Sequence, residues 1–297
     1  MFIYKYVSYQ KKYLDDIVYL IDEGKRISIS FIDSSFNKDD REVEYFANGI
    51  RIFENNNSEN RSSEGRMLVG MTSINISRIA LECESIGIKQ FYKELDNILD
   101  LVKNELLLTF ETIGNKNKEC YKSIFIGNID TDEKLLKGQK IRKVIKNSSL
   151  AIGLVGLKEC VMILSKDRDR QYELTLDILD YVNNKCELFT VESKLNFIMC
   201  EPFESKAQKE FMKCDKTIYG IRKNIIENER YDLISELVKD NYKKTANIQK
   251  KFLGGNMIDL NLSKNTTVSE IKDIIEELYE SDISFINIKK EKVDLCE

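Results

Sequence analysis

The sequence predicts an α/β fold, in which strands alternate with amphipathic helices along the chain. Residues 67–76 and the first part of residues 148–161 are rich in Ile, Val, Leu and Met, as buried strands are, and a helical pattern follows each of them. Residues 88–107 and 169–185 place apolar side chains three or four positions apart, which is typical of helices with one face in a core. The alternation of these two patterns is the basis of the prediction.

The composition limits both the class of protein and its chemistry. Of the 297 residues 42% are hydrophobic, enough for a core, and the net charge of −4 gives no bulk electrostatic case for binding nucleic acid or a membrane. No apolar run approaches the length of about 18 residues that a membrane span needs, and no secretory signal is expected. Seven cysteines without CxxC spacing predict reduced thiols in a cytoplasmic protein. The absence of histidine excludes every mechanism that needs imidazole.

The first part of the chain is predicted to contain a helix, a strand and a turn. Residues 1–26 carry apolar side chains at helical spacing, and residues 27–37, ISISFIDSSFN, form a strand-like run that ends in polar residues. Asp33 or Ser34 could be presented at the centre of a barrel, or they could simply end a core strand, which is the interpretation that we favour. Residues 42–55 predict a turn at their Asn-Gly pair, followed by a short strand.

A polar residue ends the predicted strand of residues 67–76. Asn75 stands between Ile74 and Ile76, at the point where the helical pattern begins. Its side chain either caps the following helix or points into a functional cavity, and the residues alone leave both interpretations open. The helix of residues 88–107 that comes next has a charged outer face and is interpreted as packing.

Residues 128–139, NIDTDEKLLKGQ, resemble a calcium-binding loop in their first five positions. The sixth position is Glu133, where the turn needs glycine, and the last is Gln139 in place of the bidentate glutamate. No calcium site is therefore expected. The basic run that follows, KLLKGQKIRKVIK, interleaves lysines with apolar residues and predicts a solvated helix face rather than a phosphate-binding patch.

The second half of the chain repeats the strand–turn–helix pattern. Gly153 and Gly156 allow a close backbone approach at the end of the strand that opens residues 148–161, but their spacing is too weak to indicate a phosphate loop. Pro202, the only proline, ends another strand-like run and opens a helix. A further helix is predicted near residues 268–279.

Three segments resemble one family, in the order in which that family has them. TSINISRIAL at residues 72–81 resembles a TSINLPRLA-type segment, and SSLAIGLVGLKECV at residues 148–161 resembles a GLVGLNEA-type segment. Residues 194–220 resemble a strand, a TPAES-like stretch and a helix that ends in an Asp and a Tyr-Gly pair. The chain thus resembles the anaerobic, class III, glycyl-radical ribonucleoside-triphosphate reductases.

This resemblance implies a particular architecture. The expected fold is a partial version of the ten-stranded β/α barrel of glycyl-radical enzymes. It would be formed by a single reductase-like domain over residues 1–297, without the N-terminal nucleotide cone and without the C-terminal zinc and glycyl-radical region. Because an incomplete barrel exposes sheet edges, either rearranged packing or a partner is expected to cover them.

The resemblance also implies a substrate pocket and a missing catalytic group. The substrate-pocket candidates, by position in this sequence, are Arg51, Thr72, Ser73, Asn75, Glu159, Pro202 and Glu204. The cysteine that carries the family's transient thiyl radical falls on Asn48, and an amide cannot give up a hydrogen atom as a thiol does. No catalytic residue and no metal ligand is therefore assigned. Cys296 would be a lone remnant of the family's zinc site, which needs four ligands.

The function that the resemblance implies is the reduction of ribonucleoside triphosphates to deoxyribonucleoside triphosphates, which supplies DNA replication. The family uses a glycyl radical, a structural zinc and an iron–sulfur activating enzyme, and none of these cofactors is expected in this chain. Without the thiol and the radical glycine, the chain is expected to be inactive alone. The alternatives are a pseudoenzyme that binds a nucleotide or pairs with a full-length reductase or its activating enzyme, and a gene fragment.

Overall fold

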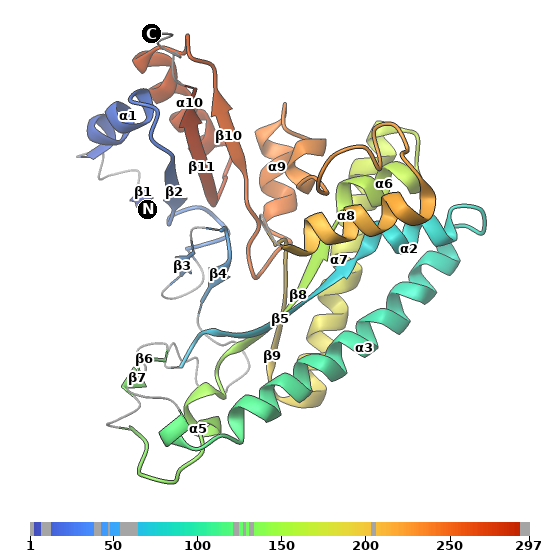
Figure 1. Cartoon of the computed structure of the whole chain (residues 1–297). Helices are drawn as coiled ribbons and strands as arrows, with labels where there is room; N and C mark the ends of the chain where they lie inside the picture. Colours follow the sequence, from blue (N-terminus) through green and yellow to red (C-terminus); the bar gives the residue numbers. More distant parts are fainter. Residues whose placement is uncertain are drawn as a thin grey trace.

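A computed structural model of the chain describes residues 3–6, 13–38, 43–46, 48–53, 65–120, 125–126, 129–130, 134–202 and 206–291. The α/β prediction is confirmed, because helices and parallel strands alternate along the chain. The molecule contains a three-stranded sheet and a four-stranded sheet, with a short hairpin between them (Figure 1).

The three-stranded sheet is parallel and follows the order β5-β8-β9. Its strands are β5 (Leu68–Asn75), β8 (Ser149–Val155) and β9 (Asn196–Cys200). Every residue of β8 and β9 is buried, as is usual for parallel strands that are covered on both faces. Within the described residues β5 pairs with β8 alone, so β5 is an edge strand.

Helices cover one face of this sheet (Figure 1). They are α2 (Ile76–Cys83), α3 (Ile88–Gly114), α6 (Leu157–Leu164) and α7 (Arg168–Ser193). Their apolar sides join the strands in one large core cluster. The helices α3 and α7 extend beyond the predicted ranges because their later turns still bury Phe110 and Phe189 in this core.

The four-stranded sheet brings segments from the two ends of the chain together (Figure 1). In spatial order its strands are β1 (Ile3–Tyr6), β2 (Ile27–Phe31), β11 (Phe285–Lys290) and β10 (Asp259–Leu262). The pairs β1–β2 and β10–β11 are parallel, whereas β2 and β11 are antiparallel. Two helices pack on this sheet in a second core cluster, namely α1 (Leu14–Asp22) and α10 (Val268–Glu280).

The polar end of the predicted strand at residues 27–37 is structural. Ser34 is buried, and its backbone N–H donates to the Phe31 carbonyl at 3.2 Å. Asp33 accepts a hydrogen bond from the Tyr279 hydroxyl at 3.2 Å. Both residues therefore close a core strand, which agrees with the interpretation favoured from the sequence.

Residues 252–257 connect the two sheets. The backbone N–H of Gly254 donates to the Met199 carbonyl at 2.8 Å, and the N–H of Glu201 donates to the Gly255 carbonyl at 3.0 Å. This segment therefore runs beside β9 before it enters β10. It continues the three-stranded sheet toward the four-stranded one, so that the two sheets curve around a common interior.

A hairpin occupies this interior. It is formed by β3 (Glu44–Tyr45) and β4 (Arg51–Ile52), which are antiparallel. The ring of Tyr45 stacks on that of Phe285 with centroids 4.5 Å apart. Tyr45 also joins Ala151 and Ile198 in a third core cluster, separate from the one under α3 and α7. The hairpin thus covers the face of the three-stranded sheet that the helices leave open.

Shorter elements complete the described chain. They are η2 (Lys118–Cys120), β6 (Phe125–Ile126), β7 (Ile129–Asp130), α5 (Arg142–Ile145), α8 (Lys206–Tyr219), η3 (Ile234–Leu237) and α9 (Tyr242–Gln249). The basic run is not the helix that was predicted, because α5 covers only a short part of it; its lysines are exposed as predicted, and its apolar residues Leu135, Ile141 and Val144 are buried. Of the calcium-like loop, residues 128 and 131–133 lie outside the described residues. In the described part, none of the helices combines the length and apolar character needed to cross a bilayer.

Candidate functional site

The carboxyl ends of β5, β8 and β9 meet at one edge of the three-stranded sheet, because the strands are parallel. α2 starts at this edge directly after β5, and α6 starts there after β8. Ligands of α/β sheets commonly bind at such an edge, where loops and the positive ends of helices gather. A ligand site is therefore expected at this edge.

A polar cluster stands at the end of β5. The Asn75 side chain accepts a hydrogen bond from the Arg78 backbone N–H at 3.1 Å and donates one to the Asp215 carboxylate at 2.7 Å. The Arg78 guanidinium and the Tyr231 hydroxyl also donate to Asp215, which is fully buried. Burial, and then the hydrogen bond to Asp215, raise the pKa of Tyr231. Asn75 thus caps α2 and at the same time joins a network that links β5 to α8.

Two buried carboxyls stand at the ends of β8 and β9. Glu159 accepts from the Asp232 backbone N–H at 3.1 Å, and Glu201 accepts from the Ile234 N–H at 2.7 Å. Burial raises the pKa of each carboxyl to about 8. Their Oε2 atoms and both polar atoms of the Asn256 side chain are buried without a hydrogen-bond partner among the described residues. The Asn256 amide still lies close enough to Glu201 to lower its pKa slightly against the effect of burial.

The face of the sheet toward the hairpin carries another group of candidates. A Cβ atom built on Gly153 would lie 3.0 Å from the Ser73 hydroxyl and 2.9 Å from the Pro202 ring, so the three residues adjoin. On β5 and β9, the Cys200 thiol donates to the Met71 sulfur at 3.4 Å. Burial raises the pKa of Cys200 to about 12, so this thiol stays protonated at neutral pH.

Thr72 lies on the opposite side of β5. Successive side chains of a strand point to opposite faces. Gly70 faces Leu106 and Thr109 of α3, and Ile74 belongs to the core beneath the helices. Thr72 shares their side, whereas Ser73 faces the hairpin. The structure therefore separates two residues that are adjacent in the sequence.

Arg51 holds the hairpin in place. It is fully buried, and its guanidinium donates to the carbonyls of Phe36 and Leu253 at 3.1 and 3.3 Å. The same group stacks over the rings of Phe36 and Phe53, 4.2 and 4.6 Å from their centroids. Asn48, by contrast, is exposed at the turn, where its side chain accepts from the Ile50 N–H at 3.4 Å. The Arg51 side chain thus has a structural role, and the Asn48 side chain is exposed at the turn of the hairpin.

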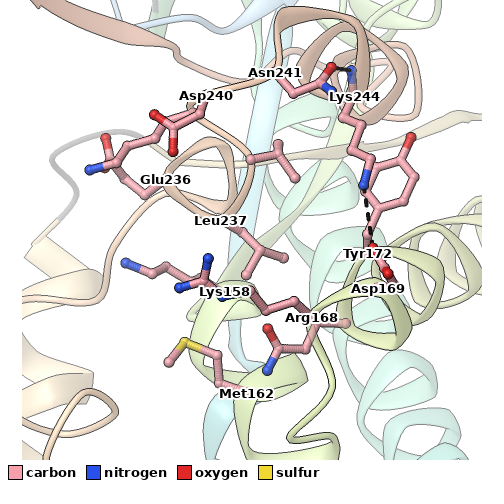
Figure 2. Close-up of a pocket in the computed structure, with 13 residues that line it drawn as sticks. Lys158, Met162, Arg168, Asp169, Tyr172, Glu236, Leu237, Asp240, Asn241 and Lys244 are labelled. Carbon is pink, nitrogen blue, oxygen red and sulfur yellow. Dashed lines mark hydrogen bonds and ion pairs between the residues drawn. The ribbon is translucent and has the colours of Figure 1, made fainter.

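A cavity of about 380 Å³ lies elsewhere, between α6, the start of α7 and residues 236–244 (Figure 2). Both acidic and basic side chains line this cavity. The Lys158 amine is 2.6 Å from Asp232, and the Lys244 amine is 3.8 Å from Asp169. Because its lysines have acidic partners at hand, this cavity does not concentrate positive charge for an anionic ligand.

The family model for anaerobic ribonucleoside-triphosphate reductases matches residues 8–297. The chain belongs to this family. The resemblance read from the sequence is therefore confirmed. Among curated proteins, none matches the chain.

Solved anaerobic ribonucleotide reductases share the fold of this family member. One of them superposes with a TM-score of 0.65 at 16% identity, over 97% of this chain and 45% of that chain. The enzyme of Thermotoga maritima in complex with dATP and CTP superposes with a TM-score of 0.65 at 17% sequence identity, over 96% of this chain and 46% of that chain. The same enzyme with glycerol in its active site superposes with a TM-score of 0.63 at 17% sequence identity, over 93% of this chain and 43% of that chain. The chain spans less than half the length of these relatives, which agrees with a partial barrel.

The structure brings some of the predicted pocket residues together and separates others. Ser73, Asn75, Glu159 and Pro202 lie on the inner face or at the carboxyl edge of the sheet. Glu204 and Cys296 lie outside the described residues. Among the described residues, no group of three or more acidic, cysteine or histidine side chains could hold a metal ion.

Three members of the edge were not singled out as site residues from the sequence. Glu201 and Asn256 have local signals, since one follows a buried strand directly and the other follows a Gly-Gly pair. Tyr231 has none, because it lies in an irregular segment with no periodic pattern.

Proposed function

We propose that this chain binds a ribonucleoside triphosphate at the carboxyl edge and inner face of its three-stranded sheet, and does not reduce it alone. The observation that carries the proposal is that Ser73 and Pro202 adjoin at Gly153 on the face toward the hairpin, next to the carboxyl edge where Asn75 stands. The start of α6 supports it, because Gly156 at its N-cap has no side chain to satisfy the first N–H groups, and such ends favour phosphates. The related structure with bound dATP and CTP supports nucleotide binding by analogy.

The second half of the proposal concerns Asn48. In the family, the resemblance assigns a cysteine thiol to this position, and that thiol carries the radical to the substrate. Asn48 is exposed at the tip of the hairpin, where it offers a carboxamide and no S–H bond. Reduction of the nucleotide would require a thiol and a glycyl radical from another chain or segment. The expected role is therefore nucleotide binding within deoxyribonucleotide synthesis, in a cytoplasmic protein.

Calorimetric titration of the reduced protein with ATP, CTP, GTP and UTP tests the binding half. Ser73→Val replaces a hydroxyl with methyl groups on the inner face, so it is expected to weaken binding by about tenfold or more. Thr72→Val is the matched control, because the neighbouring side chain points to α3 and its substitution should leave the affinity within about twofold. Asn75 is unsuitable for this purpose, since its side chain caps α2.

The titration of the two variants distinguishes binding at the proposed site from binding elsewhere. Saturable binding that Ser73→Val weakens and Thr72→Val spares supports the proposed site. Equal weakening by both variants would place binding elsewhere, and no heat of binding from a cooperatively folded protein would reject a nucleotide-binding function.

A second function is favoured by the exposed edge of β5. This eight-residue strand has one neighbour within the described residues, and free strand edges accept strands from other chains. A module that pairs with a full-length reductase or its activating enzyme would use this edge. Failure to bind nucleotide, together with formation of a complex with a full-length anaerobic reductase in size-exclusion chromatography, would favour this function over the first.

A further inference from the structure

Residues Tyr231–Ile234, here called the strap, cross the carboxyl edge of the three-stranded sheet. Three buried carboxyls from three different elements fasten them. The Tyr231 hydroxyl donates to Asp215 of α8. The N–H of Asp232 donates to Glu159 at 3.1 Å, and that of Ile234 donates to Glu201 at 2.7 Å. These three hydrogen bonds all end on acids, while the side chains of Tyr231, Leu233 and Ile234 are buried in the core clusters and hold the strap as well.

These acids differ in their charge partners. Asp215 forms an ion pair with Arg78, so its negative charge is balanced. Glu159 and Glu201 have no cation as a partner among the described residues. Lys158, which precedes Glu159 on α6, places its amine 2.6 Å from Asp232 on the strap instead.

Burial is the largest effect on Glu159; the nearby Asp232 carboxylate raises its pKa further, and the positive charge of Lys158 lowers it. The other groups around this pair add no positive charge. Burial raises the pKa values of Cys160 on α6 and Cys200 on β9, so both remain neutral thiols. Tyr231 on the strap has a raised pKa as well and stays a phenol. Asn256, from the segment beside β9, contributes a neutral amide whose polar atoms lack partners. A proton is therefore the available means of balancing each glutamate.

We propose that the strap docks more tightly while Glu159 and Glu201 carry protons, so that rising pH weakens its attachment to the edge of the sheet. A buried carboxylate with few N–H donors and no ion-pair partner costs more free energy than the protonated acid does. Release would hydrate both carboxyls and uncover the network of Asp215 and Asn75. It would also move residues 236–241, which continue from the strap and form one wall of the cavity in Figure 2.

The direction of the pH effect follows from proton linkage. In the docked state the pKa of each glutamate is raised from 4.5 to about 8, so the docked state binds more protons than the released one. Docking is therefore strongest in acid and weakens continuously as the pH rises toward about 8, above which it changes little. Strap docking is measured in the nucleotide-free protein, so this inference can fail or succeed independently of the proposed function.

Hydrogen exchange of the nucleotide-free protein, followed by mass spectrometry, tests the proposal. After correction for the intrinsic rate, protection of peptides that contain the strap should fall by about tenfold or more between about pH 6 and about pH 8. In Glu159→Gln/Glu201→Gln, protection should stay within about twofold over this range, because glutamine keeps the acceptor oxygen and does not ionise. Peptides from α3 report on global unfolding and should stay protected throughout.

Glu236→Gln provides the matched control, because Glu236 is an exposed carboxyl just beyond the strap. This variant should lose strap protection with pH as the wild type does. Constant protection in the wild type would overturn the proposal, as would an equal loss in the double variant. If the double variant does not fold, the wild-type pH series decides alone, with Glu201→Gln expected to show a shallower loss.

Discussion

Gly255→Ala is expected to lower the free energy of unfolding by about 3 kcal/mol or more. Gly255 has a φ of +87°, which L side chains rarely adopt. A Cβ atom there would lie 2.1 Å from the Gly49 carbonyl oxygen and 2.7 Å from the Arg51 nitrogen. Both are backbone atoms of the hairpin segment and neither can rotate aside. The substitution must therefore push the hairpin away from the sheet.

Urea unfolding measures this loss of stability. Gly138→Ala separates the backbone strain of a positive φ from the clash of the new Cβ atom with the hairpin. Gly138 has a φ of +80°, but no atom lies within 4 Å of a Cβ built on it. Alanine there should cost only the backbone strain, about 1 kcal/mol. Equal losses in the two variants would mean that the hairpin does not press against Gly255.

Asp215→Asn is expected to destabilise the protein by about 3 kcal/mol. The buried carboxylate accepts from three side chains, those of Asn75, Arg78 and Tyr231. A carboxamide has one acceptor oxygen and turns its NH₂ group toward donors, so at least one of these contacts is lost. The Arg78 guanidinium also loses its ionic partner. Because Arg78 is partly exposed, the expected loss of unfolding free energy is at the lower end of the range for buried ion pairs.

Thermal unfolding of this variant should be compared with that of Asp180→Asn. Asp180 forms a 2.6 Å ion pair with Lys251 at the surface, and its loss should cost less than about 1 kcal/mol. A double-mutant cycle with Arg78→Met should then give a coupling energy of about 1 kcal/mol or more between Arg78 and Asp215. Additive losses would show that the two side chains do not act as a pair.

Much of the fold could be predicted from local patterns. The strand and helix positions follow from apolar periodicity, and the match of β5 and α10 to their predicted ranges reflects strong signals within a few residues. Helix lengths were less predictable, because the last turns of α3 and α7 are stabilised by a sheet that the local sequence does not show.

The candidate site was predictable only in part. Asn75 could be identified as a polar strand end, but its partner Asp215 lies 140 residues away, and no periodicity links them. Thr72 and Ser73 point to opposite faces of β5, but the sequence does not show which face the helices cover and which faces the hairpin, because both faces are closed by distant segments. The burial of Arg51 depends on carbonyls of distant segments, which a family resemblance alone does not reveal.

Methyl NMR of protein labelled at methionine tests the central claim, which is that a nucleotide binds on the inner face of the sheet. Met71 lies on that face beside Cys200 and is 37% exposed, whereas Met162 lines the outer cavity. Met71→Leu and Met162→Leu assign the two signals. Titration with the ribonucleoside triphosphate that binds most tightly should shift the Met71 resonance saturably and leave that of Met162 unchanged. A saturable shift of Met162 alone, or no shift of either, would contradict the account.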